Sequence, residues 1–263
     1  SELLAVVARK GEPNVGVGNS KTKLERYFGK ITLGYDNWAY LEATGSYDKD
    51  SRLATPSGDF ENKSIGFFYP GASASLILSE VIPAIKNSKV INFLKVRGAI
   101  SKTGNVNLGA YGLETVFGNA LFFPYGSTSG YLTGSNTVQS SYKPEFVLNK
   151  EVGFEIGFMK NKIKLEATYY NQNNSDQIIG VQLSNTTGYT TATQNAASFT
   201  NEGLEFDLNL TPLIKINKVN IDLKLNYSYQ TSKVTSLIGD VNELGIGNFN
   251  YAVVNYPAYV FKL

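Results

Sequence analysis

The chain has 263 residues, and its content of 42% hydrophobic and 13% aromatic residues argues against intrinsic disorder. Charged residues make up only 17% of the chain, below the roughly 25% of typical soluble domains. The formal net charge of +2 disfavours a nucleic-acid partner, which selects clustered basic surfaces. The sequence contains no Cys and no His, which excludes disulfides, thiolate metal sites and Ser-His-Asp catalysis. We therefore expect no enzyme, no metal and no cofactor.

Apolar and polar residues alternate with a period of two in several segments, which is the pattern of a β-strand with two different faces. In the clearest segment, Ile221, Leu223 and Leu225 share one face and charged or amide residues share the other. Many segments are about 9–13 residues long, whereas soluble strands average about 5–6 and a tilted membrane strand needs about 9–11. In chain order, the eight segments are 27–35, 39–47, 65–78, 94–101, 151–158, 163–170, 202–210 and 219–230.

The links between these segments alternate between shorter and longer. Tight turns are predicted at Asp36-Asn37 and at 159–162, and 211–218 is also short. The link 79–93 contains Pro83 and is expected to hold a short helix. Up-and-down outer-membrane barrels alternate in this way, because their periplasmic turns are short and their extracellular loops are long. The predicted long links are 49–63, 102–145, 172–198 and 231–263.

These patterns predict an all-β fold, an antiparallel up-and-down transmembrane β-barrel in the bacterial outer membrane. Aromatic residues near strand ends are candidates for the two girdles at the membrane surfaces. These are Tyr27, Tyr35, Trp38, Tyr47, Phe67, Phe68, Phe146, Phe158, Tyr169 and Tyr229. A passive porin, a small structural outer-membrane barrel and a soluble carbohydrate-binding β-sandwich remain alternatives, since sandwich strands also alternate.

One long link is rich in aromatic residues among Gly and Ser. Aromatic side chains in such a loop can stack on sugars or pack on a partner protein, and they can equally fold back on the loop itself. The candidate ligand-binding residues of this loop are Phe117, Phe122, Phe123, Tyr125 and Tyr131.

Short motifs stand in a characteristic order between residues 25 and 211. They are Glu25-Arg26-Tyr27-Phe28-Gly29, Ala43-Thr44-Gly45 with Asp48, Ser51 and Arg52, Tyr69-Pro70-Gly71-Ala72, Ser79-Glu80, Leu94-Lys95-Val96-Arg97, Thr103-Gly104-Asn105, Lys143-Pro144-Glu145, Glu151 with Gly153 and Glu155, Tyr169-Tyr170, and Asn201-Glu202-Gly203-Leu204-Glu205. In this order and spacing they resemble the SusC/RagA family of TonB-dependent transporters from Bacteroidetes.

The resemblance implies a 22-stranded barrel closed by an N-terminal plug, which imports oligosaccharides or peptides. Residues 1–263 are then part of the receptor's β-barrel domain, about eight strands from its C-terminal half, with the plug domain absent. The implied partners are outer-membrane lipids, the rest of the barrel and its plug, a SusD-like surface lipoprotein, TonB through the missing N-terminal part, and the oligosaccharide or peptide substrate.

Charged residues facing lipid would each cost a few kcal/mol near the midplane. We therefore expect the charged strand residues to line the lumen or to meet the plug. They are Glu42, Lys95, Arg97, Glu151, Glu155, Lys164, Glu166, Glu205, Asp207, Asp222 and Lys224.

Overall fold

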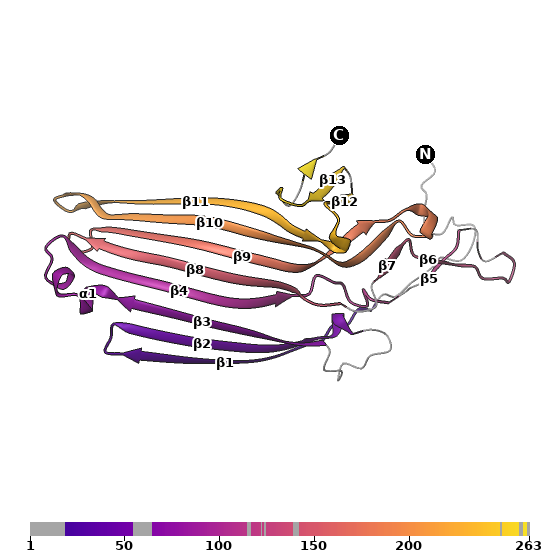
Figure 1. Cartoon of the computed structure of the whole chain (residues 1–263), viewed down its shortest axis with the longest axis horizontal. Coiled ribbons are helices and arrows are strands. Elements are labelled where there is room, and N and C mark those ends of the chain that lie inside the picture. The colour runs from indigo at the N-terminus through magenta and orange to yellow at the C-terminus, as the bar shows by residue number, and fades with distance from the viewer. Residues whose placement is uncertain are drawn as a thin grey trace, which may run out of the picture.

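A computed structural model describes residues 19–54, 65–114, 117–121, 123, 125–138, 142–247, 249–257 and 260–261. Eight long strands form one elongated antiparallel sheet in the order β1-β2-β3-β4-β8-β9-β10-β11 (Figure 1). Each long strand corresponds to one of the segments predicted from alternation. Their bounds are β1 Leu24–Tyr35, β2 Ala39–Asp50, β3 Gly66–Ile77, β4 Ile91–Asn105, β8 Glu145–Phe158, β9 Ile163–Gln182, β10 Thr191–Ile216 and β11 Val219–Leu237.

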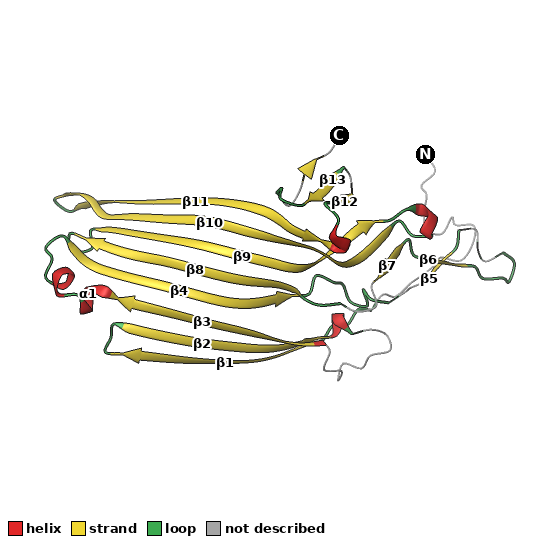
Figure 2. Cartoon of the chain, in the orientation of Figure 1, coloured by secondary structure: helices red, strands yellow, loops and turns green. Residues whose placement is uncertain are grey.

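The remaining elements are short and lie at the two ends of the long strands (Figure 2). The β3–β4 link forms two short helices, as Pro83 led us to expect. Among the described residues, no helix combines the length and the apolar character that a membrane-spanning helix needs. The short elements are η2 Ser51–Leu53, α1 Leu78–Val81, α2 Pro83–Lys86, β5 Phe117–Asn119, β6 Tyr131–Thr133, β7 Asn136–Val138, η4 Asn185–Thr187, η5 Ile238–Asp240, β12 Glu243–Gly247, β13 Asn250–Val253 and β14 Val260–Phe261.

Both predicted tight turns are present. Asp36 and Asn37 adopt φ values of 44° and 58°, the left-handed conformation that a two-residue hairpin turn demands. Met159, Lys160 and Asn161 also have positive φ and join β8 to β9. These turns lie at the same end of the sheet as α1 and α2, whereas the longer connections gather at the opposite end, which we call the loop end (Figure 1).

One predicted link is largely wrong. The segment 172–198 was expected to be a long loop, but β9 continues to Gln182 and β10 begins at Thr191. This region carries Asn, Gln and Thr on both faces, so the sequence shows no alternation there. The backbone ladder nevertheless continues, because pairing does not require that one face be apolar. β11 likewise extends to Leu237, beyond its predicted end.

The sheet has one apolar and one charged face. Cross-strand pairing aligns a single row of mostly apolar residues over all eight long strands: Leu33, Leu41, Ala74, Gly98, Val152, Tyr169, Leu204 and Tyr229. The apolar face is exposed, with Val152 at 58% and Leu225 at 51%. A soluble sandwich would cover this face with a second sheet, so its exposure argues against that alternative.

Phe67 corrects the prediction of the aromatic girdle. Its side chain packs against a buried cluster at the loop end instead of facing outward with its neighbour Phe68, which is exposed. Alternation along β3 explains the difference, since Phe67 and Phe68 are consecutive and must lie on opposite faces. The buried cluster consists of Leu53, Ile65, Val106, Leu113, Tyr142 and Ile178.

The described part of the sheet is open. Within the residues that the structure describes, β1 and β11 each pair with a single long strand, so both edges are available to further strands. An open edge exposes a row of backbone N–H and C=O groups, which a membrane barrel must pair.

Candidate functional site

The predicted aromatic loop is a small β-hairpin at the loop end. β5 pairs with β6 in antiparallel register, from Phe117↔Thr133 to Asn119↔Tyr131, and an isolated bridge joins Tyr125 to Thr128. Figure 1 shows this hairpin beyond the end of the main sheet.

Most of the candidate aromatic side chains are open to solvent. The exposed fractions are 65% for Phe117, 81% for Tyr125 and 63% for Tyr131. Phe123 is less exposed because its ring packs over Gly130, where an added Cβ would approach the ring to 2.4 Å. Phe122 lies outside the described residues. The hairpin therefore brings three exposed aromatic residues to one projecting element and leaves one to hold the hairpin itself.

The charged residues predicted for the lumen all lie on the face opposite the apolar row. Asp207, Glu166 and Glu155 stand directly opposite one another on β10, β9 and β8. Arg97 offsets this row, because its Nη2 lies 2.6 Å from Glu166 Oε1 and donates at 2.8 Å to Thr168 Oγ1. The result is a polar, charged surface, the kind that suits a water-filled bore.

At the loop end, residues of β1, β2 and η2 form bidentate ion pairs. Arg26 donates from Nε and Nη2 to the two carboxylate oxygens of Asp48, at 2.8 and 2.6 Å. Arg52 contacts the buried Asp50 in the same way, with Nη2 at 2.5 Å from Oδ2, and Asp50 also caps η2 by accepting from the Arg52 backbone N–H. Hydrogen bonding to Asp50 raises the pKa of Arg52 above its usual value.

A seam separates β3 from β4 beside these ion pairs. The two strands pair only from Gly71↔Ser101 to Ile77↔Lys95. Beyond Gly71 the chain continues through Pro70, which has no backbone N–H to donate, and the ring of Tyr69 packs over Gly104. An added Cβ on Gly104 would lie 2.4 Å from that ring, so only glycine fits beneath Tyr69.

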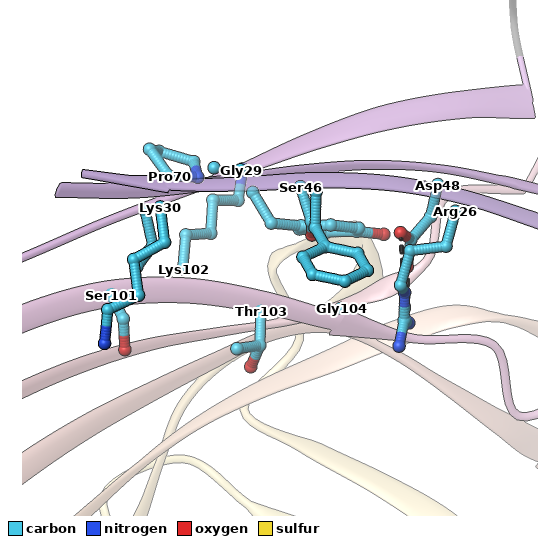
Figure 3. Close-up of a pocket in the computed structure, with 14 residues that line it drawn as sticks. Arg26, Gly29, Lys30, Ser46, Asp48, Pro70, Ser101, Lys102, Thr103 and Gly104 are labelled. Carbon is cyan, nitrogen blue, oxygen red and sulfur yellow. Dashed lines mark hydrogen bonds and ion pairs between the residues drawn. The ribbon is translucent and has the colours of Figure 1, made fainter.

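The seam encloses a cavity of about 450 Å³, lined by residues of β1, β2, β3 and β4. Figure 3 shows Arg26 and Asp48 at one end of the cavity, with Lys30 and Ser101 at the other. Lys30 is bound to Glu42 at 2.6 Å, so the charged groups at both ends already have partners. Both of these ion pairs join β1 to β2. Lys102 of β4 also lines the cavity, and its Nζ lies 3.9 Å from the centre of the Phe146 ring.

Sequence reasoning found these residues only as motif members and missed their contacts. Arg26, Asp48, Tyr69 and Gly104 are far apart in the chain and meet at one place. Glu145 joins them: its carboxylate accepts from the Ile178 backbone N–H at 2.9 Å and from the Asn105 side chain at 3.4 Å. In the sequence, the hint of this contact was that Tyr69 and Gly104 both belong to the motifs quoted above.

Comparison with known proteins agrees with this architecture. The family profile described as "TonB dependent receptor-like, beta-barrel" matches residues 8–263. "TonB-dependent receptor P26" of Formosa agariphila is 24% identical over 217 residues, which are 82% of this chain and 21% of that protein. "TonB-dependent receptor SusC" of Bacteroides thetaiotaomicron is 25% identical over 227 residues, 84% of this chain and 22% of that protein. The chain thus spans about a fifth of the length of these curated relatives.

Two solved structures share the fold. "Structure of the RagAB peptide transporter" matches with a TM-score of 0.82 and 19% identity, covering 99% of this chain and 28% of that chain. The RagAB peptide importer in its "closed-closed" state matches with a TM-score of 0.81, 19% identity and the same coverage.

The fold and its two unlike faces define the chain as part of an outer-membrane β-barrel protein. Within that class, the chain belongs to the TonB-dependent receptor-like β-barrel family. The SusC relative and the RagAB structures confirm the resemblance to the SusC/RagA family.

Proposed function

We propose that this chain forms part of the barrel wall of a TonB-dependent transporter that imports nutrients across the outer membrane. The observation that carries the proposal is the exposed, mostly apolar row over eight strands, with a charged face on the opposite side of the sheet. Acyl chains are the solvent that such a row requires, and water is the solvent that the opposite face requires.

The whole protein is proposed to be much larger than this chain. Its relatives are about four times as long, and both edges of the described sheet are open to further strands. We infer a barrel of 22 strands, the size that the SusC/RagA resemblance implies, with residues 1–263 as one stretch of its wall. We propose that the whole protein also has a plug within the bore and a segment that contacts TonB.

The proposed substrate is an oligosaccharide or a peptide. Two similar structures are described as a peptide transporter and a peptide importer, which supports a peptide as the substrate. A SusD-like surface lipoprotein is the partner that the SusC/RagA resemblance implies. We assign no catalytic role to the chain, in agreement with the names of its relatives, which are receptors.

Uptake by the whole protein tests the proposal. Cells that lack the full-length gene are given labelled peptides or labelled oligosaccharides, and uptake is compared with that of complemented cells. We expect uptake of one class to be lost in the deletion strain and also in complemented cells whose TonB is inactivated. Uptake that persists without TonB and rises linearly with concentration would show a passive porin instead.

The β5–β6 hairpin is proposed to contact the substrate or the SusD-like partner. Its exposed aromatic rings lie on a projecting element, where stacking on sugars or packing on a protein is available. In the full-length protein, Tyr125→Ala should lower uptake or partner capture about fivefold or more without changing the amount of folded barrel. Phe123→Ala is the matched aromatic control, because Phe123 packs within the hairpin; equal effects of the two variants would assign the aromatic residues to loop folding.

A further inference from the structure

The cavity beside the β3–β4 seam, which we call the seam cavity, has one positive charge more than its carboxylates balance. Its charged lining residues are Arg26, Lys30, Lys102 and Asp48. Asp48 accepts from two nitrogens of Arg26, and Lys30 pairs with Glu42. Within the described part of the chain, Lys102 has no ion pair, and the residue opposite it on β8 is Leu148. The Lys102 ammonium is therefore the uncompensated charge of the cavity.

An aromatic ring holds this ammonium in place. The Lys102 Nζ lies 3.9 Å from the centre of the Phe146 ring, and that ring packs against Tyr69 with 6.2 Å between the ring centres. An ammonium group has three N–H donors, and an aromatic face attracts the cation without accepting all three. Lys102 is thus positioned before a ligand arrives and keeps donors for one.

Tyr69 adds a second polar group to the same cavity. Its side chain is only 8% exposed, because its ring packs over Gly104. Among the residues that the structure describes, none forms a hydrogen bond with the Tyr69 hydroxyl. A buried hydroxyl without a partner is unfavourable, and a ligand oxygen in the cavity would supply that partner.

Phe28 gives the cavity an apolar wall. It lies on the charged face of β1 opposite Ser46, yet its side chain is 83% exposed. A flat ring beside polar groups can stack on a sugar or pack on an apolar side chain. The volume of about 450 Å³ falls within the range of about 300–1,000 Å³ that is usual for small-ligand sites. Hydroxyl groups complete the lining, from Thr44, Ser46, Ser101 and Thr103.

We propose that the seam cavity binds a carboxylate group of the transported substrate, with the Lys102 ammonium and the Tyr69 hydroxyl as its donors (Figure 3). Charge-assisted hydrogen bonds of this kind are short and strong. A carboxylate is the anion that both proposed substrate classes can carry, at the C-terminus or acidic side chains of a peptide and in the uronic acid units of an oligosaccharide. The inference rests on the proposed function and narrows its substrate to acidic members.

Ligand binding by the full-length protein tests this assignment. The protein is purified in non-ionic detergent, and isothermal titration calorimetry measures its affinity for two pairs of probes. One pair is tetra-alanine with a free C-terminal carboxylate and the same peptide as its C-terminal amide. The other pair is trigalacturonate and its methyl ester. In each pair only the carboxylate charge differs, and the pair that shows a preference identifies the source of the carboxylate.

Two variants and a matched control locate the binding site. Lys102→Gln removes the ammonium, and Tyr69→Phe removes the hydroxyl while keeping the ring over Gly104. Lys95→Gln is the control, because Lys95 belongs to the same strand but does not line the seam cavity.

We expect the unmodified protein to bind one carboxylate probe about tenfold more tightly than its neutral counterpart. Lys102→Gln should abolish this preference, Tyr69→Phe should reduce it about threefold, and Lys95→Gln should change it by less than about twofold. Equal binding of the charged and neutral probes, a preference that survives Lys102→Gln, or an equal loss in Lys95→Gln would each overturn the proposal. If Lys102→Gln fails to fold, an unchanged preference in Tyr69→Phe overturns it.

The result separates from the transport proposal, because binding is measured without TonB. Carboxylate binding that needs Lys102, in a protein without TonB-dependent uptake, would overturn the proposed function and support the site. TonB-dependent uptake by a protein that binds charged and neutral probes equally would do the reverse.

Discussion

β4 pairs with β8 at fourteen positions, but it pairs with β3 at only seven. On the β8 side, backbone hydrogen bonds continue to Asn105 and side chains simply alternate between the two faces. On the β3 side, the ladder ends at Gly71, and beyond it the Tyr69 ring packs over Gly104 beside a cavity. The block β8–β11 is therefore held by backbone pairing, whereas the seam depends on particular side chains.

This difference predicts where the protein tolerates substitution. In the block β8–β11, the effect of a substitution on stability depends on which face the residue occupies, because the backbone hydrogen bonds do not depend on side-chain identity. At the seam, the effect of a substitution on stability depends on which side-chain contact it removes. Four experiments test this contrast, in order of decreasing expected effect.

The largest effect is expected from a charge on the apolar face. Leu225→Arg places a cation near the middle of the outward apolar stretch of β11 and should destabilise the inserted barrel by about 2–4 kcal/mol. Ser228→Arg is the control, since Ser228 lies on the opposite face beside Glu205, and it should change stability by less than about 0.5 kcal/mol. Guanidinium unfolding of the full-length protein, followed by its heat-modifiable gel mobility, measures both. Equal effects would show that the two faces do not meet different solvents.

Next in size is a clash at the seam. Gly104→Val should cost about 1–3 kcal/mol, because the new side chain overlaps the Tyr69 ring. Gly29→Val is the matched control, since an added Cβ there meets nothing within 4 Å. Combining Gly104→Val with Tyr69→Ser should recover part of the loss, and the absence of recovery would show that Tyr69 is not the obstacle.

The Arg26–Asp48 pair should contribute less. Asp48 is buried while the Arg26 side chain is 54% exposed, so solvent screens part of the interaction. We expect Asp48→Asn to cost about 1 kcal/mol. A double-mutant cycle with Arg26→Gln isolates the coupling between the two side chains, and additive effects would show that this contact between β1 and β2 does not stabilise the protein.

The smallest effect is expected at the other end of the cavity. Lys30 and Glu42 form an ion pair whose side chains are more exposed, so Glu42→Gln should cost only a few tenths of a kcal/mol. The loss should shrink further at high salt, because screening weakens exposed pairs. An effect as large as that of Asp48→Asn would show that the two ion pairs between β1 and β2 contribute equally to stability.

The sequence was sufficient to predict the strands wherever they have two unlike faces. Residues such as Ile221, Leu223 and Leu225 alternate because lipid and water impose opposite demands on neighbouring positions. The turn at Asp36-Asn37 was also predictable, since Asn and Asp tolerate positive φ. The turn at 159–162 was predictable because only four residues separate two alternating segments. Those local rules act on a few adjacent residues and are therefore visible in the sequence.

Tertiary structure decided what depends on residues far apart in the chain. Only pairing with β8 and β10 shows that 172–182 is strand, because both faces of that segment are polar. Only the register between β3 and β4 reveals the seam, and only folding brings Arg26, Asp48 and Gly104 together. A period of two records which face a residue occupies, but the partner across the strand is fixed by the register of the whole sheet.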